Sequence, residues 1–145
     1  MEKTYTMQDV AAMTGLTTRT LRSYQQQGFL RGEKENGVWR FTDEAMGALF
    51  ANGAVAPSIK AKRNALVYDF MLDEKKKSDE LCAVLDLMAE GKDAMDISGF
   101  FCSAINSGEF SGLAFGFEHS GKNARVIVKG PAEEVLGIMN AYYNG

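Results

Sequence analysis

The stretch from Val10 to Gly28, VAAMTGLTTRTLRSYQQQG, constrains the fold most, because two short amphipathic segments meet there at a glycine. Gly15 stands where a tight turn between two helices favours a residue that tolerates positive φ. Thr17 can cap the second helix with its hydroxyl, and Gly28 can end it. Small and apolar residues fall where the two helices would face each other: Val10, Ala11, Leu16, Leu21 and Tyr24. The pattern predicts a helix-turn-helix, and the alternative is a solvated helical hairpin in an all-α domain.

The second of these helices carries polar groups suited to nucleic acid. It begins at Thr17, Thr18 and Arg19, and Arg22 follows one turn later. Hydroxyl and guanidinium donors bind phosphate oxygens, and guanidinium also matches the acceptor edge of guanine in a major groove. We therefore expect these residues to contact double-stranded DNA.

A β-hairpin is expected directly after this helix. Two short strand-like segments, one at Phe29–Leu30 and one at Val38–Phe41, flank a charged loop that ends in Asn-Gly, a strong hairpin signal. A hairpin in this position is a wing, and wings reach the DNA backbone. The cations available for that contact are Arg31, Lys34 and Arg40. Trp39 either anchors the wing in the core, which we favour because large aromatic side chains usually pack, or stacks on DNA.

The net charge of −3 conceals an uneven distribution. Residues 1–63 hold nine Lys and Arg against six acids, whereas residues 64–145 hold seven against thirteen. A basic first part on an acidic remainder is typical of a DNA-binding head joined to a part that does not touch DNA. Lys60, Lys62 and Arg63 form a basic cluster, of which Lys60 and Arg63 are candidate contacts to the DNA backbone.

Residues 73–93 are expected to link the head to the rest of the chain. A helix is predicted from Ser58 to about Leu72, where it bends or breaks, and DEKKKSDE (residues 73–80) continues as a solvated helix with i,i+4 charge pairs or as a linker. Apolar residues then recur at helical spacing, at Leu81, Val84, Leu85 and Met88, up to Gly91. We interpret this stripe as a dimerisation helix, and simple core packing is the alternative.

The last part, residues 94–145, changes character. A helix is predicted over residues 94–107, strands over Leu113–Glu118 and Arg125–Lys129, and a final helix that starts at Pro131. The fold class is therefore α+β, with three predicted parts: a winged helix-turn-helix at 1–72, a linker or dimerisation helix at 73–93, and a small α-β-β-α module at 94–145.

Aromatic residues are dense in this module. Five of them are candidates for an apolar ligand pocket: Phe100, Phe101, Phe115, Phe117 and Tyr142. The ordinary alternative is a small core that needs large side chains. Polar handles for a ligand would be Glu118, Tyr142 or Cys102.

The composition argues against several other classes of protein. Cys82 and Cys102 with the single His119 do not make a tetrahedral zinc site, so we expect two small buried thiols with no metal and no cofactor. The alternatives are a redox pair or a two-thiolate site for a soft metal. Glu118, His119 and Cys102 are not spaced as a catalytic set, so no enzyme is predicted. We expect a cytoplasmic protein, because no apolar run is long enough for a membrane span and the N-terminus does not resemble a signal peptide.

The N-terminal sequence resembles the DNA-binding domain of the MerR family of bacterial transcription regulators over about the first 70 residues. The matching features are the Tyr5-Thr6 opening, the T-G-L turn, the T-L-R-x-Y run at Thr20–Tyr24, G-F-L at Gly28–Leu30, and N-G followed by R-F-T in the wing. The resemblance implies a dimer on a pseudo-palindromic promoter, where the protein distorts the duplex so that RNA polymerase can use it. It also implies DNA contacts at Thr18, Arg19, Arg22, Tyr24 and Arg40.

Two hypotheses about function follow. The first is a homodimeric, sequence-specific regulator whose C-terminal part binds a small apolar ligand or a protein partner. The second is an architectural DNA-binding protein, such as an excisionase-like or chromosome-anchoring factor, in which the C-terminal part serves assembly and no ligand is sensed.

Overall fold

The first half of the chain contains four helices and three short strands among the described residues of the computed structural model, which describes residues 3–110 and 112–145. The elements are β1 (Thr4–Tyr5), α1 (Met7–Thr14), α2 (Thr18–Gln26), β2 (Glu33–Glu35), β3 (Val38–Thr42), α3 (Asp43–Ala51) and α4 (Ala56–Leu72). The helix, turn and helix expected from Val10 to Gly28 are therefore present as α1 and α2.

The helix ends in this half are fixed by the caps that the sequence indicates. The Thr6 hydroxyl accepts from the Asp9 backbone N–H at 3.2 Å, and the Asp9 carboxylate accepts from the Thr6 N–H at 2.9 Å. This reciprocal pair satisfies two donors at the start of α1. Gly15 has φ 74°, which confirms the left-handed turn between α1 and α2.

The predicted hairpin is present, but its first strand is Glu33–Glu35 and not Phe29–Leu30, and a third strand joins it. β2 pairs with β3 in antiparallel fashion, and Asn36 and Gly37 form the turn with φ values of 52° and 80°. Positive φ at both turn positions gives the twist that two-residue hairpins need. β1, which the sequence did not indicate, pairs with the other edge of β3.

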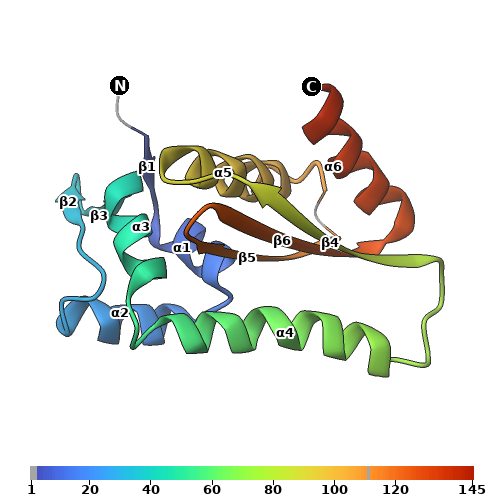
Figure 1. Ribbon diagram of the computed structural model, residues 1–145, viewed down its shortest axis with the longest axis horizontal. Coiled ribbons are helices and arrows are strands. Elements are labelled where there is room, and N and C mark those ends of the chain that lie inside the picture. Colours follow the sequence, from blue (N-terminus) through green and yellow to red (C-terminus); the bar gives the residue numbers. More distant parts are fainter. Residues whose placement is uncertain (1–2, 111) are drawn as a thin grey trace.

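The second half contains another three-stranded antiparallel sheet. Its elements are β4 (Glu80–Met88), α5 (Lys92–Asn106), β5 (Ala114–Ser120), β6 (Asn123–Pro131) and α6 (Ala132–Asn144), and its strand order is β4-β6-β5. The helices α5 and α6 lie on one face of this sheet, and α4 runs along the other face (Figure 1). The predicted α-β-β-α order is therefore present, with an additional strand in front of it.

That additional strand corrects the prediction for residues 73–93. Glu80–Met88 forms the nine-residue strand β4, not a helix, and no helix is found between Asp73 and Asp79. Exposure alternates along the second half of β4, where Leu85 and Leu87 are half-buried while Val84, Asp86 and Met88 are exposed. The apolar residues of this segment, ELCAVLDLM, fit the two-residue period of a strand as well as the spacing of a helix. The strand forms because β6, whose central residues are buried, needs a neighbouring strand on both sides. The expected dimerisation helix is thus absent.

One hydrophobic core connects the two halves. The Phe50 ring of α3 meets the Phe117 ring of β5 edge to face, with centroids 5.2 Å apart. Buried residues of the first half, such as Leu49 and Val55, and of the second half, such as Phe101, belong to the same cluster. The three-part division into 1–72, 73–93 and 94–145 remains a prediction, and it does not coincide with a break in this core.

Replacing Phe117 with Ala tests whether the halves are stabilised together. The side chain is 1% exposed, so its removal should lower the free energy of unfolding by about 3–5 kcal/mol. Denaturant unfolding followed by Trp39 fluorescence in the first half and by far-ultraviolet circular dichroism should give one coincident, shifted transition. Tyr68→Ala, at a 68% exposed position on α4, is the matched control. Two separate transitions would contradict a shared core.

Candidate nucleic-acid interface

The helix α2 presents the residues that were expected to contact DNA. Leu21 is fully buried and fixes one side of the helix against the core. Thr18, Arg19 and Arg22 are exposed on the other side. Thr17 is also exposed, but its hydroxyl accepts from the Thr20 N–H at 3.2 Å and so is engaged in capping α2.

Tyr24 links α2 to the segment that follows. It is half-buried, and its ring lies 5.9 Å from the Phe29 ring, centroid to centroid. Its carbonyl oxygen accepts from the N–H groups of Phe29 at 2.9 Å and Leu30 at 3.3 Å. Tyr24 therefore fixes the angle at which the chain leaves α2 toward the hairpin.

A cleft of about 620 Å³ separates α2 from the β2–β3 hairpin. It is lined by Arg22, Gln25, Gln26, Leu30, Arg31, Gly32 and Trp39. The fold thus brings together Arg22 of α2 and Arg31 from the loop before β2, both of which the sequence predicted as DNA contacts. Sequence reasoning missed Gln25 and Gln26, although glutamine can bind adenine through two hydrogen bonds. Their position one turn after Arg22 was the available signal.

Trp39 belongs to this cleft and not to the core. It is 38% exposed, whereas Phe41, two residues along the same face of β3, is fully buried. Lys34 lies directly opposite Trp39 in the hairpin, with its Nζ 5.7 Å from the centroid of the indole ring. The residue that anchors the hairpin in the core is therefore Phe41 and not Trp39. Trp39 lies nearer the turn of the hairpin, outside the covered part of β3.

Arg40 points away from this cleft. Successive side chains in a strand alternate between faces. Arg40 therefore shares its face with Val38 and Thr42, and all three line a separate groove of about 1030 Å³ between the hairpin and α3. Glu33 lies opposite Arg40 in the hairpin, and Glu44 lines the same groove. The structure does not bring Arg40 together with the arginines of α2.

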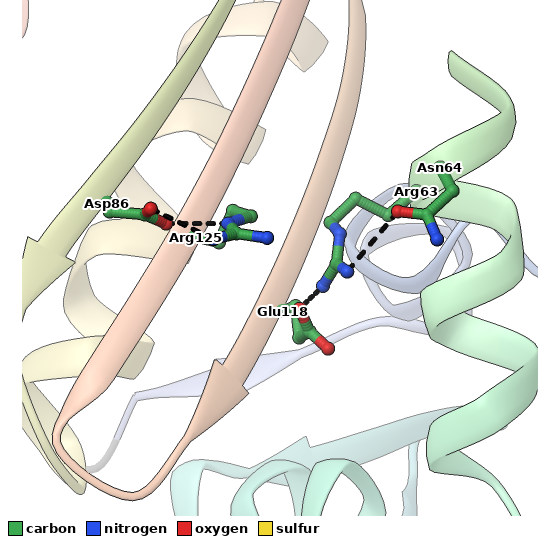
Figure 2. Close-up of polar contacts among 5 residues, drawn as sticks. All are labelled: Arg63, Asn64, Asp86, Glu118 and Arg125. Carbon is green, nitrogen blue, oxygen red and sulfur yellow. Dashed lines mark hydrogen bonds and ion pairs between the residues drawn. The ribbon is translucent and has the colours of Figure 1, made fainter. Parts of the chain in front are cut away.

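The two candidate contacts on α4 differ in accessibility. Lys60 is exposed near the start of the helix. Arg63, by contrast, is 2% exposed and forms an ion pair with Glu118 of β5, so its expected role as a backbone contact is wrong. Figure 2 shows Arg63 reaching from α4 to Glu118. Gly116 makes this approach possible, because a Cβ there would lie 2.7 Å from the Leu66 Cδ1.

The ion pair continues into a row of charges across the sheet. Arg125 of β6 lies opposite both Glu118 of β5 and Asp86 of β4 in the strand register. Its Nε and Nη2 donate to the two Asp86 carboxylate oxygens at 2.6 and 2.9 Å (Figure 2). The hydrogen bond from Arg125 lowers the pKa of Asp86. Burial lowers the pKa of Arg63, and the nearby Arg125 cation lowers it further.

The aromatic residues that were candidates for a ligand pocket pack on one another. Phe101 is fully buried, and its ring centroid lies 5.2 Å from that of Tyr142, 5.4 Å from that of Phe100 and 6.1 Å from that of Phe115. Phe117 packs on Phe50, as described above. Phe101 and Phe117 therefore belong to the core, Phe115 and Tyr142 pack against it half-buried, and Phe100 is 36% exposed. A ligand pocket among these residues stays a prediction.

Cys102 lies where α5 meets α1. Cys102 is buried, and its Sγ lies 3.8 Å from the Asp9 carbonyl oxygen. Burial together with the Asp9 carboxylate raises the pKa of the thiol to about 12.

Within residues 3–110 and 112–145, His, Cys, Asp and Glu side chains form no group of three or more that could hold a metal ion. Over the same residues, no helix combines the length and apolar character needed to span a bilayer.

Replacing Glu118 with Gln tests the contribution of the ion pair between α4 and β5. The substitution leaves a buried guanidinium without its counter-charge and should lower the free energy of unfolding by about 2 kcal/mol. Arg63→Met in the same chain removes the buried charge, so the double variant should be more stable than Glu118→Gln alone. Chemical denaturation measures both. Glu109→Gln, at an exposed position, is the control, and equal loss in it would contradict a specific pair.

Comparison with known proteins gives one match. Residues 5–49 match the family model described as MerR HTH family regulatory protein. This range extends from β1 to α3 and includes α1, α2 and the hairpin. No curated protein and no solved structure matches the chain.

Proposed function

Residues 5–49 carry a helix-turn-helix of the MerR family, and we propose from this premise that the protein is a sequence-specific transcription regulator that binds promoter DNA as a dimer. In this proposal α2 enters the major groove. Arg19 and Arg22 supply donors for phosphate or guanine, and Thr18 supplies a hydroxyl. The hairpin acts as a wing that follows the adjacent backbone.

The observation that carries the proposal is the cleft between α2 and the hairpin. It places the guanidinium groups of Arg22 and Arg31 and the amides of Gln25 and Gln26 around one opening. Lys34 adds an ammonium on the face of the hairpin that carries Trp39. Cations and amides gathered between a helix and a hairpin suit a phosphate backbone beside base edges. Arg40 and Lys60 are proposed as outer contacts, since each lies away from this cleft.

The connection between the DNA-binding half and the second half supports regulation in this proposal. The buried Tyr5 hydroxyl donates to the Asp43 carboxylate at 2.7 Å and lies 3.3 Å from the Met95 carbonyl oxygen of α5. The second half therefore contacts the strand that precedes α1. A ligand or protein partner on the second half would act through such contacts, and the same holds for any contact with RNA polymerase.

Selection of bound sequences from a random duplex pool tests the proposed function. The wild-type protein should enrich a two-fold-symmetric motif. Arg19→Ala and Arg22→Ala should each weaken binding to that motif about tenfold or more, because a specific guanidinium contact contributes about 1–3 kcal/mol. Lys92→Ala, on the exposed start of α5, is the control and should bind as the wild type does. If weak binding persists without any motif, the architectural alternative replaces the regulator.

The salt dependence of binding tests Lys34 as a phosphate contact. Lys34→Ala should weaken binding to all sequences by a similar factor, because a phosphate contact carries no base information. The slope of log affinity against log salt should become shallower by about one for the lost contact. Titration of a labelled duplex at several salt concentrations measures this. An unchanged slope would contradict a wing that contacts the backbone.

A further inference from the structure

The strand β4 lies at one edge of the second sheet, and its outer edge is not paired with another strand of the described residues. The register with β6 shows which backbone groups face outward. The Ala132 N–H donates to the Asp79 carbonyl, and the Ala89 N–H donates to the Lys122 carbonyl, each inside the ladder. Since these inward groups belong to odd-numbered residues, the N–H and C=O groups of Cys82, Val84 and Asp86 face outward.

This edge carries little of the usual protection against pairing. Of its two acids, Glu80 lies at the start of the strand and Asp86 is paired with Arg125. Edge strands commonly carry lysine, proline or a bulge, or are very short. β4 is nine residues long, contains neither lysine nor proline, and pairs with β6 without a break in register. Beside the edge, Val84 is 48% exposed and Met88 is 81% exposed on the face that also carries Asp86.

The helix α6 extends the apolar surface on the other face of the sheet. α6 packs over β4 and β6. A Cβ on Gly137 would lie 2.9 Å from the Phe110 ring, so this flank of α6 faces the segment after α5. Leu136 and Tyr143 share another flank of α6, about a third of a turn from Gly137 by helical spacing, and are 60% and 59% exposed.

We propose that β4 pairs with β4 of a second copy in antiparallel fashion, with the two-fold axis at Val84. The result is a continuous six-stranded sheet. The outward N–H and C=O groups of one copy then form hydrogen bonds with those of the other. This follows because a two-fold axis at an outward-facing residue places the outward-facing residues of the two strands opposite each other. The two α6 helices would lie on the same face of this sheet, because α6 packs over β4 and β6 in each copy.

The absence of facing acids and the pairing of apolar side chains across the axis commit this edge to a second copy of the same chain. With the axis at Val84, Glu80 lies opposite Met88 of the other copy, and Asp86 lies opposite Cys82. The two acids of the strand, Glu80 and Asp86, therefore do not face an acid of the other copy. Val84 faces its own equivalent, and the leucines at 81 and 87 face each other. The strand is therefore self-complementary in this register, as a two-fold interface requires.

The β4 interface would hold together the dimer of the proposed function, and only its biological role rests on that proposal. The interface and the regulatory function can be tested, and can fail, separately. Mass in solution without DNA tests the interface, whereas binding of DNA by the α2 variants tests the regulator.

The experiment uses charge reversal at the two-fold axis in the full-length chain. Wild-type protein should have the mass of a dimer by light scattering after size exclusion. Val84→Lys and Val84→Glu should each be monomeric, since like charges would face each other, and should dissociate at least about tenfold more readily. An equimolar mixture of the two variants should recover the dimer mass, because lysine then faces glutamate. Leu72→Lys, at a 69% exposed position on α4, should remain a dimer.

Recovery in the mixture also shows that both variants are folded, and circular dichroism provides a second check. A monomeric wild-type protein would overturn the proposal and leave the edge available to a strand of a different protein. The proposed register would be overturned if Val84→Lys alone were dimeric. It would also be overturned if the mixture stayed monomeric while both variants were folded, because Val84 would then not lie opposite Val84 of the second copy.

Discussion

The packing on both sides of β5 is the constraint on which the rest of the structure depends. One face of this strand carries Phe117, which meets Phe50 of the DNA-binding half. The other face carries Gly116 and Glu118, which receive Leu66 and Arg63 of α4. A single strand thereby fixes two helices of the first half, α3 and α4, against the second half. The orientation of α2 relative to the second sheet follows from these contacts.

Burying Arg63 is costly unless its charge is compensated, and the fold compensates it with a row of alternating charges. Asp86, Arg125 and Glu118 follow one another across three strands, and Arg63 lies over this row. The row joins the outermost strand, β4, to the helix that continues from the DNA-binding half. Arg125 and Asp86 both act on Arg63: the Arg125 cation lowers the pKa of Arg63, and the Asp86 carboxylate raises it.

Local signals made much of the first half predictable. The caps at Thr6 and Thr17, the glycine at 15 and the Asn-Gly turn each act over a few residues, so the sequence displays them directly. β4 was missed because ELCAVLDLM satisfies two periodicities, and only the need of β6 for a second partner selects the strand. The burial of Arg63 and the packing of the aromatic rings on Phe101 depend on contacts between distant segments. Such contacts leave no mark on the local pattern of residues.

The shared core restricts how this DNA-binding half could be exchanged between proteins. In a regulator whose head is joined by a flexible linker, recombination at the linker can transfer the head to a different sensing domain. Here a cut after Leu72 would uncover Phe50 and Ile59 and leave the Arg63 charge without Glu118. The head would have to evolve together with the sheet that covers it, so sequence change in α4 and in β5 is coupled.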